Sequence, residues 1–163
     1  MGSTVVKKSL KKENHRAEGA IKRLEETQKR ERRKNEDLQK EPLASHIKRG
    51  EWNDALLEAC KIGNKEIVEL MIEKGADNWN YGLFGACEGG NKEIVELIIG
   101  KGANNWNCGL KGACEGGNKE IIELMIEKGA EDWDWGLQGA SSVSIRYLLW
   151  LFSYYPPKLL KTV

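Results

Sequence analysis

The sequence predicts an all-α fold, a solenoid of short helix–turn–helix units that follows a long N-terminal extension, either helical or disordered. Three observations lead to this prediction: a period of 27 residues from Trp52 onward, an amphipathic helical segment in each period, and a change of charge after residue 50. A period between 20 and 50 residues is typical of stacked repeats. We therefore expect an arm over residues 1–44 and a repeat domain over 45–163. The expected units cover about residues 50–76, 77–103, 104–130 and 131–157, the last ending in a divergent cap.

The N-terminal arm is basic and polar. Residues 1–50 hold 15 Lys or Arg and 8 Asp or Glu, a net charge of +7, which leaves 11 and 17 in the rest of the chain, a net charge of −6. A heptad pattern can be drawn through the arm, but many of its core positions are polar, so self-association through a coiled coil is only one open possibility. The densest basic cluster comprises Lys29, Arg30, Arg32, Arg33 and Lys34.

This basic cluster suits a nuclear-import signal, a phosphate contact, or a solubilising or docking arm. Glutamates interrupt the cluster, and the arm has no aromatic residues. Both features argue against specific nucleic-acid recognition.

The second helix of each repeat is the clearer one. In the segment NKEIVELIIGKGA, Asn91 is a good N-cap and Glu93 adds negative charge to the first turn. Apolar residues recur at helical spacing from Ile94 onward, and Gly102 follows as a left-handed stop. The segments NKEIVELMIEKGA and NKEIIELMIEKGA predict the same helix in the neighbouring units.

The first helix, roughly Trp79 to Glu88, carries Gly82 and Gly85, and the next two units repeat both glycines. Each glycine costs up to ~1 kcal/mol relative to alanine inside a helix. Repetition of this cost indicates a packing requirement, so we expect small residues to let neighbouring first helices lie close together. The pair Gly89-Gly90 then makes the tight turn into the second helix.

The segment ACEGGNKEIVELIIGKGAN, residues 86–104, resembles an ankyrin repeat. Leu83 and Ala86 also match the family's first-helix signature Thr-Pro-Leu-His-x-Ala, although the Thr-Pro and His are missing here. Each unit is about six residues shorter than the usual ~33, and the missing residues fall where the family has a β-hairpin finger, which we expect to be reduced or absent. Shortened units of this kind are similar to ankyrin-type arrays encoded by large DNA viruses. The resemblance implies non-catalytic protein–protein recognition through the fingers and inner helices.

Two ladders of matching residues are interpreted as scaffold. The tryptophans at 52, 79, 106 and 133 align strictly, which favours a structural role over a ligand-stacking surface. Equivalent cysteines at 60, 87 and 114 would lie ~8–10 Å apart in stacked helices, too far for a disulfide or a shared zinc ion. His15 and His46 both lie outside the repeats, so we expect no metal, no cofactor and no catalytic site.

Positions that differ between units are the candidate partner-binding residues, because they are released from maintaining the stack. We predict that they form a variable strip across one face of the solenoid, either a contact surface with aromatic anchors or neutral drift at solvent positions. The variable strip comprises Asn78, Tyr81, Phe84, Asn105, Cys108, Lys111, Asp132, Trp135 and Gln138.

The C-terminal end departs from the repeat. At the 27-residue offset, Leu148 and Leu149 fall on apolar positions of a second helix, and three aromatic residues replace outward glutamates. A terminal unit is expected to have a polar outer face, so we predict an interface formed by Tyr147, Trp150 and Tyr154. A docking site for the basic arm and an array of altered frame or length are the alternatives.

These features favour a protein–protein interaction module, directed at a host or viral protein if the chain is viral. The alternatives are a structural or virion-associated assembly component and a nucleic-acid-associated protein that uses the arm. No stretch approaches the ~20 apolar residues that span a bilayer, so no membrane contact is expected. Cysteines without a disulfide pattern favour the cytoplasm or nucleus, which includes an infected host cell, or a virion.

Overall fold

The computed structural model describes residues 2–140 and 142–154, although the side chains of 2–14, 17, 148 and 151–154 are not described. The chain divides between Leu38 and Gln39 into two compact units. Within the described residues no strand occurs, which confirms the all-α prediction. No helix in this part of the chain combines the length and the apolar character that a bilayer crossing requires.

The first compact unit is the single helix α1, Gly2–Leu38. Charged and polar residues surround most of it, and most of its described side chains are exposed. The extension is therefore helical rather than disordered. The predicted arm of residues 1–44 extends past this unit into the start of α2, Leu43–Arg49.

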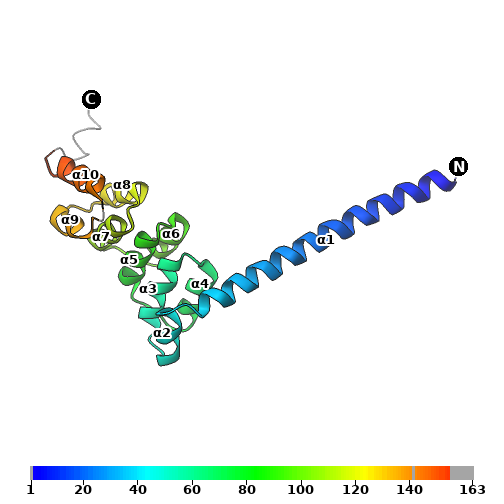
Figure 1. The fold of residues 1–163 in the computed structure, drawn as a ribbon, viewed down its shortest axis with the longest axis horizontal. Helices are drawn as coiled ribbons and strands as arrows, with labels where there is room; N and C mark the ends of the chain where they lie inside the picture. The colour runs from blue at the N-terminus through cyan, green and yellow to red at the C-terminus, as the bar shows by residue number, and fades with distance from the viewer. Residues whose placement is uncertain (1, 141, 155–163) are drawn as a thin grey trace. The chain divides into compact units, whose positions relative to one another are not determined.

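The second compact unit is an array of helix pairs that follow one another from α3 to α10 (Figure 1). We call the first helix of each pair inner and the second outer. The inner helices are α3 (Trp52–Ile62), α5 (Trp79–Gly89), α7 (Trp106–Gly116) and α9 (Trp133–Gly139). The outer helices are α4 (Lys65–Glu73), α6 (Lys92–Gly100), α8 (Lys119–Lys128) and α10 (Val143–Tyr154).

The ends of the outer helices form as the sequence predicts. The side chain of Asn91 accepts a hydrogen bond from the backbone N–H of Ile94 at 3.2 Å, and Asn64 caps α4 in the same way. Gly102 has a φ of 113°, in the left-handed region where glycine has no Cβ penalty. Between these ends, the fully buried side chains on α6 include Ile94, Val95 and Ile98.

Inner helices pack against one another through their backbones. A Cβ on Gly85 would overlap the carbonyl oxygen of Leu57 on α3, and one on Gly112 would overlap that of Phe84 on α5. Gly139 faces Lys111 on α7 in the same manner, with the carbonyl oxygen 2.8 Å from an added Cβ. The glycines are therefore required for close packing, as predicted, and each faces the preceding inner helix.

The first inner helix lacks these glycines. Ala55, Glu58 and Ile62 of α3 occupy the positions of Gly82, Gly85 and Gly89 of α5. The preceding neighbour of α3 is the short helix α2, which packs against it directly. The array thus has a distinct N-terminal end that is already covered.

An asparagine in each of the first three units clamps the loop that leads to the next. The Asn80 Oδ1 accepts hydrogen bonds from the backbone N–H groups of Asn104 and Asn105, both at 2.9 Å. Asn53 and Asn107 make the equivalent pairs of hydrogen bonds, with distances of 2.9–3.0 Å. This asparagine clamp holds the short loop that stands where a β-hairpin finger was expected to be reduced or absent.

The outer helices meet through longer side chains. Lys65 of α4 lies 2.6 Å from Glu93 of α6, and Lys92 of α6 lies 2.7 Å from Glu120 of α8. Backbone contact in the inner row and side-chain contact in the outer row make the inner row the more closely spaced. A stack with unequal spacing curves towards its closer row, so the inner helices lie on the concave side.

In the last helix pair the outer helix begins three residues earlier, relative to the start of the inner helix, than in the other pairs. An added Cβ on Gly109 would meet Met125, and one on Gly136 would meet Leu149, which is three residues nearer along the chain. Ser142 caps α10 by accepting from the Ile145 N–H, as the asparagines cap α4 and α6. The 27-residue frame for this unit was therefore wrong: α9 ends early at Gly139, and α10 is offset by 24 residues from α8.

The glycine contacts lead to a paired stability prediction. We expect Gly112→Ala to destabilise the array by about 1–3 kcal/mol or more, because its Cβ has to displace backbone. Gly100→Ala is the matched control, since an added Cβ at this helix end meets nothing within 4 Å. It should be neutral or stabilise by up to about 1 kcal/mol. Urea unfolding followed by circular dichroism measures both, and equal stabilities would contradict the backbone-contact explanation.

The asparagine clamp leads to a second stability prediction. Asn80→Ala removes the acceptor of two backbone hydrogen bonds, so we expect a loss of about 1–3 kcal/mol in unfolding free energy. Asn80→Asp keeps an acceptor oxygen at the same place and should recover most of that loss. Thermal melts of the two variants check this, and an Asn80→Asp variant as unstable as Asn80→Ala would refute the clamp.

Candidate functional site

Three positions of the variable strip begin the inner helices. The side-chain oxygens of Asn78, Asn105 and Asp132 accept hydrogen bonds from the backbone N–H groups three residues later, at 3.2, 3.0 and 3.0 Å respectively. All three are exposed, yet each is an N-cap that stabilises its helix. These three residues therefore have a structural role at the helix starts, and the prediction that they are released from structural duty was wrong.

The next strip position carries Tyr81, Cys108 or Trp135. Tyr81 is 40% exposed, the highest value for an aromatic side chain on the inner helices. Cys108 and Trp135 are half-buried. The Cys108 thiol lies 3.8 Å from the Asn80 carbonyl oxygen, and burial raises its pKa, so it remains a neutral thiol.

The third strip position carries Phe84, Lys111 or Gln138. Phe84 and Lys111 are half-buried, and Gln138 is exposed. The Lys111 Nζ lies 5.3 Å from the centroid of the Trp135 ring, a cation–π distance. This contact joins α7 to α9, so strip residues of successive units are direct neighbours on the surface.

A hollow of about 510 Å³ adjoins the strip at the last loop. Its lining is largely acidic and consists of Asn107, Glu131, Asp132, Trp133 and Asp134. Carboxylates beside an indole ring form an environment that suits cationic groups. The strip therefore ends in an acidic, aromatic corner.

The two ladders have the scaffold role that the sequence predicts. Trp79 and Trp106 are half-buried, and each packs beside the glycine that follows the outer helix of its own unit. Cys60 and Cys114 are buried and free, and burial raises the pKa of each thiol to about 12. Cys87 is likewise buried and free, with a raised pKa. Protonated buried thiols behave as small apolar side chains.

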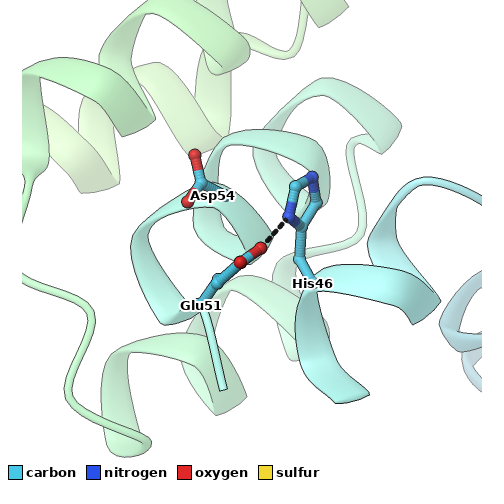
Figure 2. Close-up of side chains that lie close together, drawn as sticks. All are labelled: His46, Glu51 and Asp54. Atoms are coloured by element: carbon cyan, nitrogen blue, oxygen red, sulfur yellow. Dashed lines mark hydrogen bonds and ion pairs between the residues drawn. The ribbon is translucent and has the colours of Figure 1, made fainter. Parts of the chain in front are cut away.

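A polar cluster that the sequence did not predict lies where α2 meets α3. Figure 2 shows His46 of α2 beside Glu51, which directly precedes α3, and Asp54 of α3, with the His46 Nδ1 2.8 Å from a Glu51 carboxylate oxygen. One ligand atom from each residue lies within 4.8 Å of the others, a spacing that could hold a metal ion. Arg49, however, lies 2.8 Å from the same Glu51 oxygen and supplies the cation itself.

The cluster is therefore best explained as a set of structural contacts that hold α2 against the start of α3. Glu51 and Asp54 also stand at the N-terminus of α3, where negative charge is favoured by the helix dipole. Sequence reasoning set His46 aside because it lies outside the repeats. The signal that could have found the cluster is Gly50, whose left-handed turn brings residues 46 and 51 together.

The predicted terminal interface is partly described. Tyr147 and Trp150 lie on α10 with their ring centroids 5.9 Å apart and their ring planes inclined by 28°, and both side chains are exposed. The side chain of Tyr154 lies outside the described residues. In the α1 arm, Lys29, Arg30, Arg32 and Arg33 are exposed and Lys34 is half-buried.

Comparison with known proteins identifies the repeat. Residues 52–81 match the family model of the ankyrin repeat, a segment that covers α3, α4 and the start of α5. No curated protein and no solved structure matches the chain. The chain thus carries an ankyrin repeat within an ankyrin-like array of helix pairs. Ankyrin repeats are in general modules for protein–protein interaction and typically act as non-enzymatic scaffolds, whereas the likeness to viral arrays stays a prediction.

The contacts of Glu51 with His46 and Arg49 predict that the stability of the chain depends on pH. Hydrogen bonds from Arg49 and then His46 lower the pKa of Glu51 to about 2. Its unfolded value is about 4.3, so its stabilising contribution is complete above that pH and is lost as the pH falls through about 2. We expect Glu51→Gln to melt below the wild-type chain at pH 6, with the gap closing on acidification. The control Glu73→Gln, on the exposed side of α4, should show no such closing gap.

Proposed function

We propose that this ankyrin-repeat chain is a non-catalytic module that binds a protein partner along the variable strip of its inner helices. The choice of the strip and of its aromatic anchors is based on the side chains at the variable positions of the inner helices. The contact between Lys111 and Trp135 carries the proposal, because it joins strip positions of adjacent units into one continuous surface.

Most other inner-helix positions are already committed to the fold. The glycines admit the neighbouring backbone, the asparagine clamps hold the loops, and the cap residues begin the helices. Side chains that differ between units and serve none of these purposes are Tyr81, Phe84, Cys108, Lys111, Trp135 and Gln138. Aromatic residues are enriched at protein interfaces and tryptophan and tyrosine among binding hot spots, and this set contains Tyr81, Phe84 and Trp135.

The position of the strip also supports this function. The strip runs along the inner row, on the concave side of the array, and solenoids use such extended concave surfaces for binding. At its C-terminal end it reaches the acidic hollow at Glu131, Asp132 and Asp134. A partner segment with apolar side chains followed by a basic one matches this order.

The arm offers a weaker alternative. Glu31 interrupts the exposed basic residues of α1, and no aromatic side chain stands among them to stack on a base. A nucleic-acid contact there therefore lacks the features that the array has for a protein.

The strip proposal is tested by partner capture with matched variants. We expect proteins retained by the wild-type chain to be lost with Tyr81→Ala and Trp135→Ala, because truncating a hot-spot anchor lowers affinity by about 30-fold or more. Capture on immobilised protein, followed by quantitative mass spectrometry, measures the loss.

Glu96→Ala provides the control, since Glu96 is exposed on the outer helix α6, away from the strip. It should retain the same proteins as the wild-type chain. If both anchor variants capture those proteins as well as the control does, the strip is not the binding surface.

A further inference from the structure

The helix α1 keeps its charged residues away from one side. Residues 18–38 make three heptads and contain 13 Asp, Glu, Lys or Arg. In a heptad frame with Ile21 at position a and Leu24 at position d, only one of these charges, Glu31, falls on the six a and d positions. The other 12 occupy 12 of the remaining 15 positions. We call the a and d positions the seam, which consists of Ile21, Leu24, Gln28, Glu31, Asn35 and Leu38.

The apolar start of the seam is open to solvent. Ile21 is 54% exposed and Leu24 is 63% exposed. Residues three apart on a helix are neighbours, so these two side chains form one patch. The helix is a compact unit by itself, and that unit contains no second element that covers the patch. Helices in proteins gain most of their stability by packing an amphipathic face, so the seam is a face that lacks its partner within the unit.

The residues of the seam specify what kind of partner fits it. Isoleucine at position a with leucine at position d is the combination that favours two-stranded coiled coils. A polar asparagine at a single a position, as at Asn35, fixes the register of such a pair at a cost in stability. Another copy of α1 therefore matches the seam layer by layer, because each side chain then meets its own counterpart.

We infer that the seam of α1 binds the seam of a second copy of the chain, in a parallel, in-register, two-stranded coiled coil. In this arrangement position g of one helix lies beside position e of the other, five residues later. Ala20 then faces Glu25, and Thr27 faces Arg32. The Thr27 hydroxyl already donates to the Arg23 carbonyl oxygen at 2.8 Å within its own helix. Neither flanking contact brings like charges together.

An antiparallel pair fits these flanks less well. Aligning Ile21 of one helix with Leu24 of the other brings Glu18 beside Glu25, and like charges at flanking positions disfavour that arrangement. A lipid surface is also a poor match, because residues 18–38 include no aromatic side chain to anchor in a membrane interface. The parallel pair of identical helices is the occupant that the charge pattern favours.

Glu31 weakens the pair that the other seam residues support. At position d of a parallel pair it lies against the Glu31 of the second helix, where two like charges meet. The dimer is therefore reversible rather than permanent. The same position offers a sharp test, because a leucine there should tighten the pair only if this register is correct.

Sedimentation velocity of the full chain, from micromolar to millimolar concentration, tests the dimer. We expect the weight-average mass to rise from the monomer towards twice that value. Ile21→Glu should raise the dissociation constant at least about tenfold, while circular dichroism shows the helix retained, since glutamate forms helix at least as well as isoleucine. Lys22→Gln is the control, because it changes the net charge by the same one unit outside the seam and should dimerise like the wild-type chain.

Three outcomes of this measurement would overturn the inference. They are a chain that stays monomeric throughout, assemblies larger than two, and equal weakening by Ile21→Glu and Lys22→Gln. If the monomeric chain instead bound anionic lipid vesicles and lost them with Ile21→Glu, the seam would belong to a lipid surface.

The register is tested by the opposite kind of variant. Glu31→Leu should lower the dissociation constant at least about tenfold, because it replaces two facing charges with an apolar layer. Glu26→Leu adds the same leucine outside the seam and should leave the dissociation constant unchanged. An unaltered or weaker dimer with Glu31→Leu, or the same gain with Glu26→Leu, would contradict the heptad frame.

Cysteine cross-linking reports the direction of the helices. In a parallel pair Leu24→Cys places two thiols face to face, so a disulfide-linked dimer should form under mild oxidation. Arg23→Cys, at the outward position c, should give only the background of the wild-type chain, which carries the half-buried Cys108. Equal cross-linking of the two variants would rule out the parallel pair. These readouts are independent of the strip, because α1 can pair whether or not the inner helices bind a partner.

Discussion

Contact between the backbones of successive inner helices is the constraint on which the rest of the array depends. Gly85, Gly112 and Gly139 each lie against a carbonyl group of the helix before, where no other residue fits without displacing main chain. That spacing brings each asparagine clamp within reach of the next loop and sets Lys111 over Trp135. Because the outer helices contact one another through long side chains, they are spaced more widely than the inner helices, and this difference in spacing curves the stack.

Structure and binding occupy different residues of the same short helices. Within α5, glycines face the preceding helix, Leu83, Ala86 and Cys87 fill the core, and Asn80 holds the following loop. A 27-residue unit has little room beyond these duties. The side chains available to a partner are therefore few per unit, and a useful surface arises only when several units align them.

Much of the fold could be predicted from the sequence, because the period and the helix caps are local signals. The reason for the inner-helix glycines was also predictable, since a repeated cost needs a repeated cause. The asparagine clamp was not, because a matching Asn80 looks like any polar surface position until its loop is placed. The 24-residue offset of the last outer helix was missed because its many apolar residues suit either register. Leu149, for example, falls on an apolar position of α8 at an offset of 27 and also at an offset of 24. The strip residues could be listed, but the cap role of Asn78 required coordinates.

The repeated contact surfaces have a consequence for how such a chain changes over generations. The unit of α5 and α6 offers the next unit nearly the same backbone, clamp and lysine that the unit of α3 and α4 offers it. An in-frame duplication or loss of one whole unit in the middle of the gene would therefore keep the same contacts at every junction between units. The array can lengthen or shorten without requiring any new type of contact between units. Each added copy would bring two or three side chains that the fold does not constrain and on which selection can act.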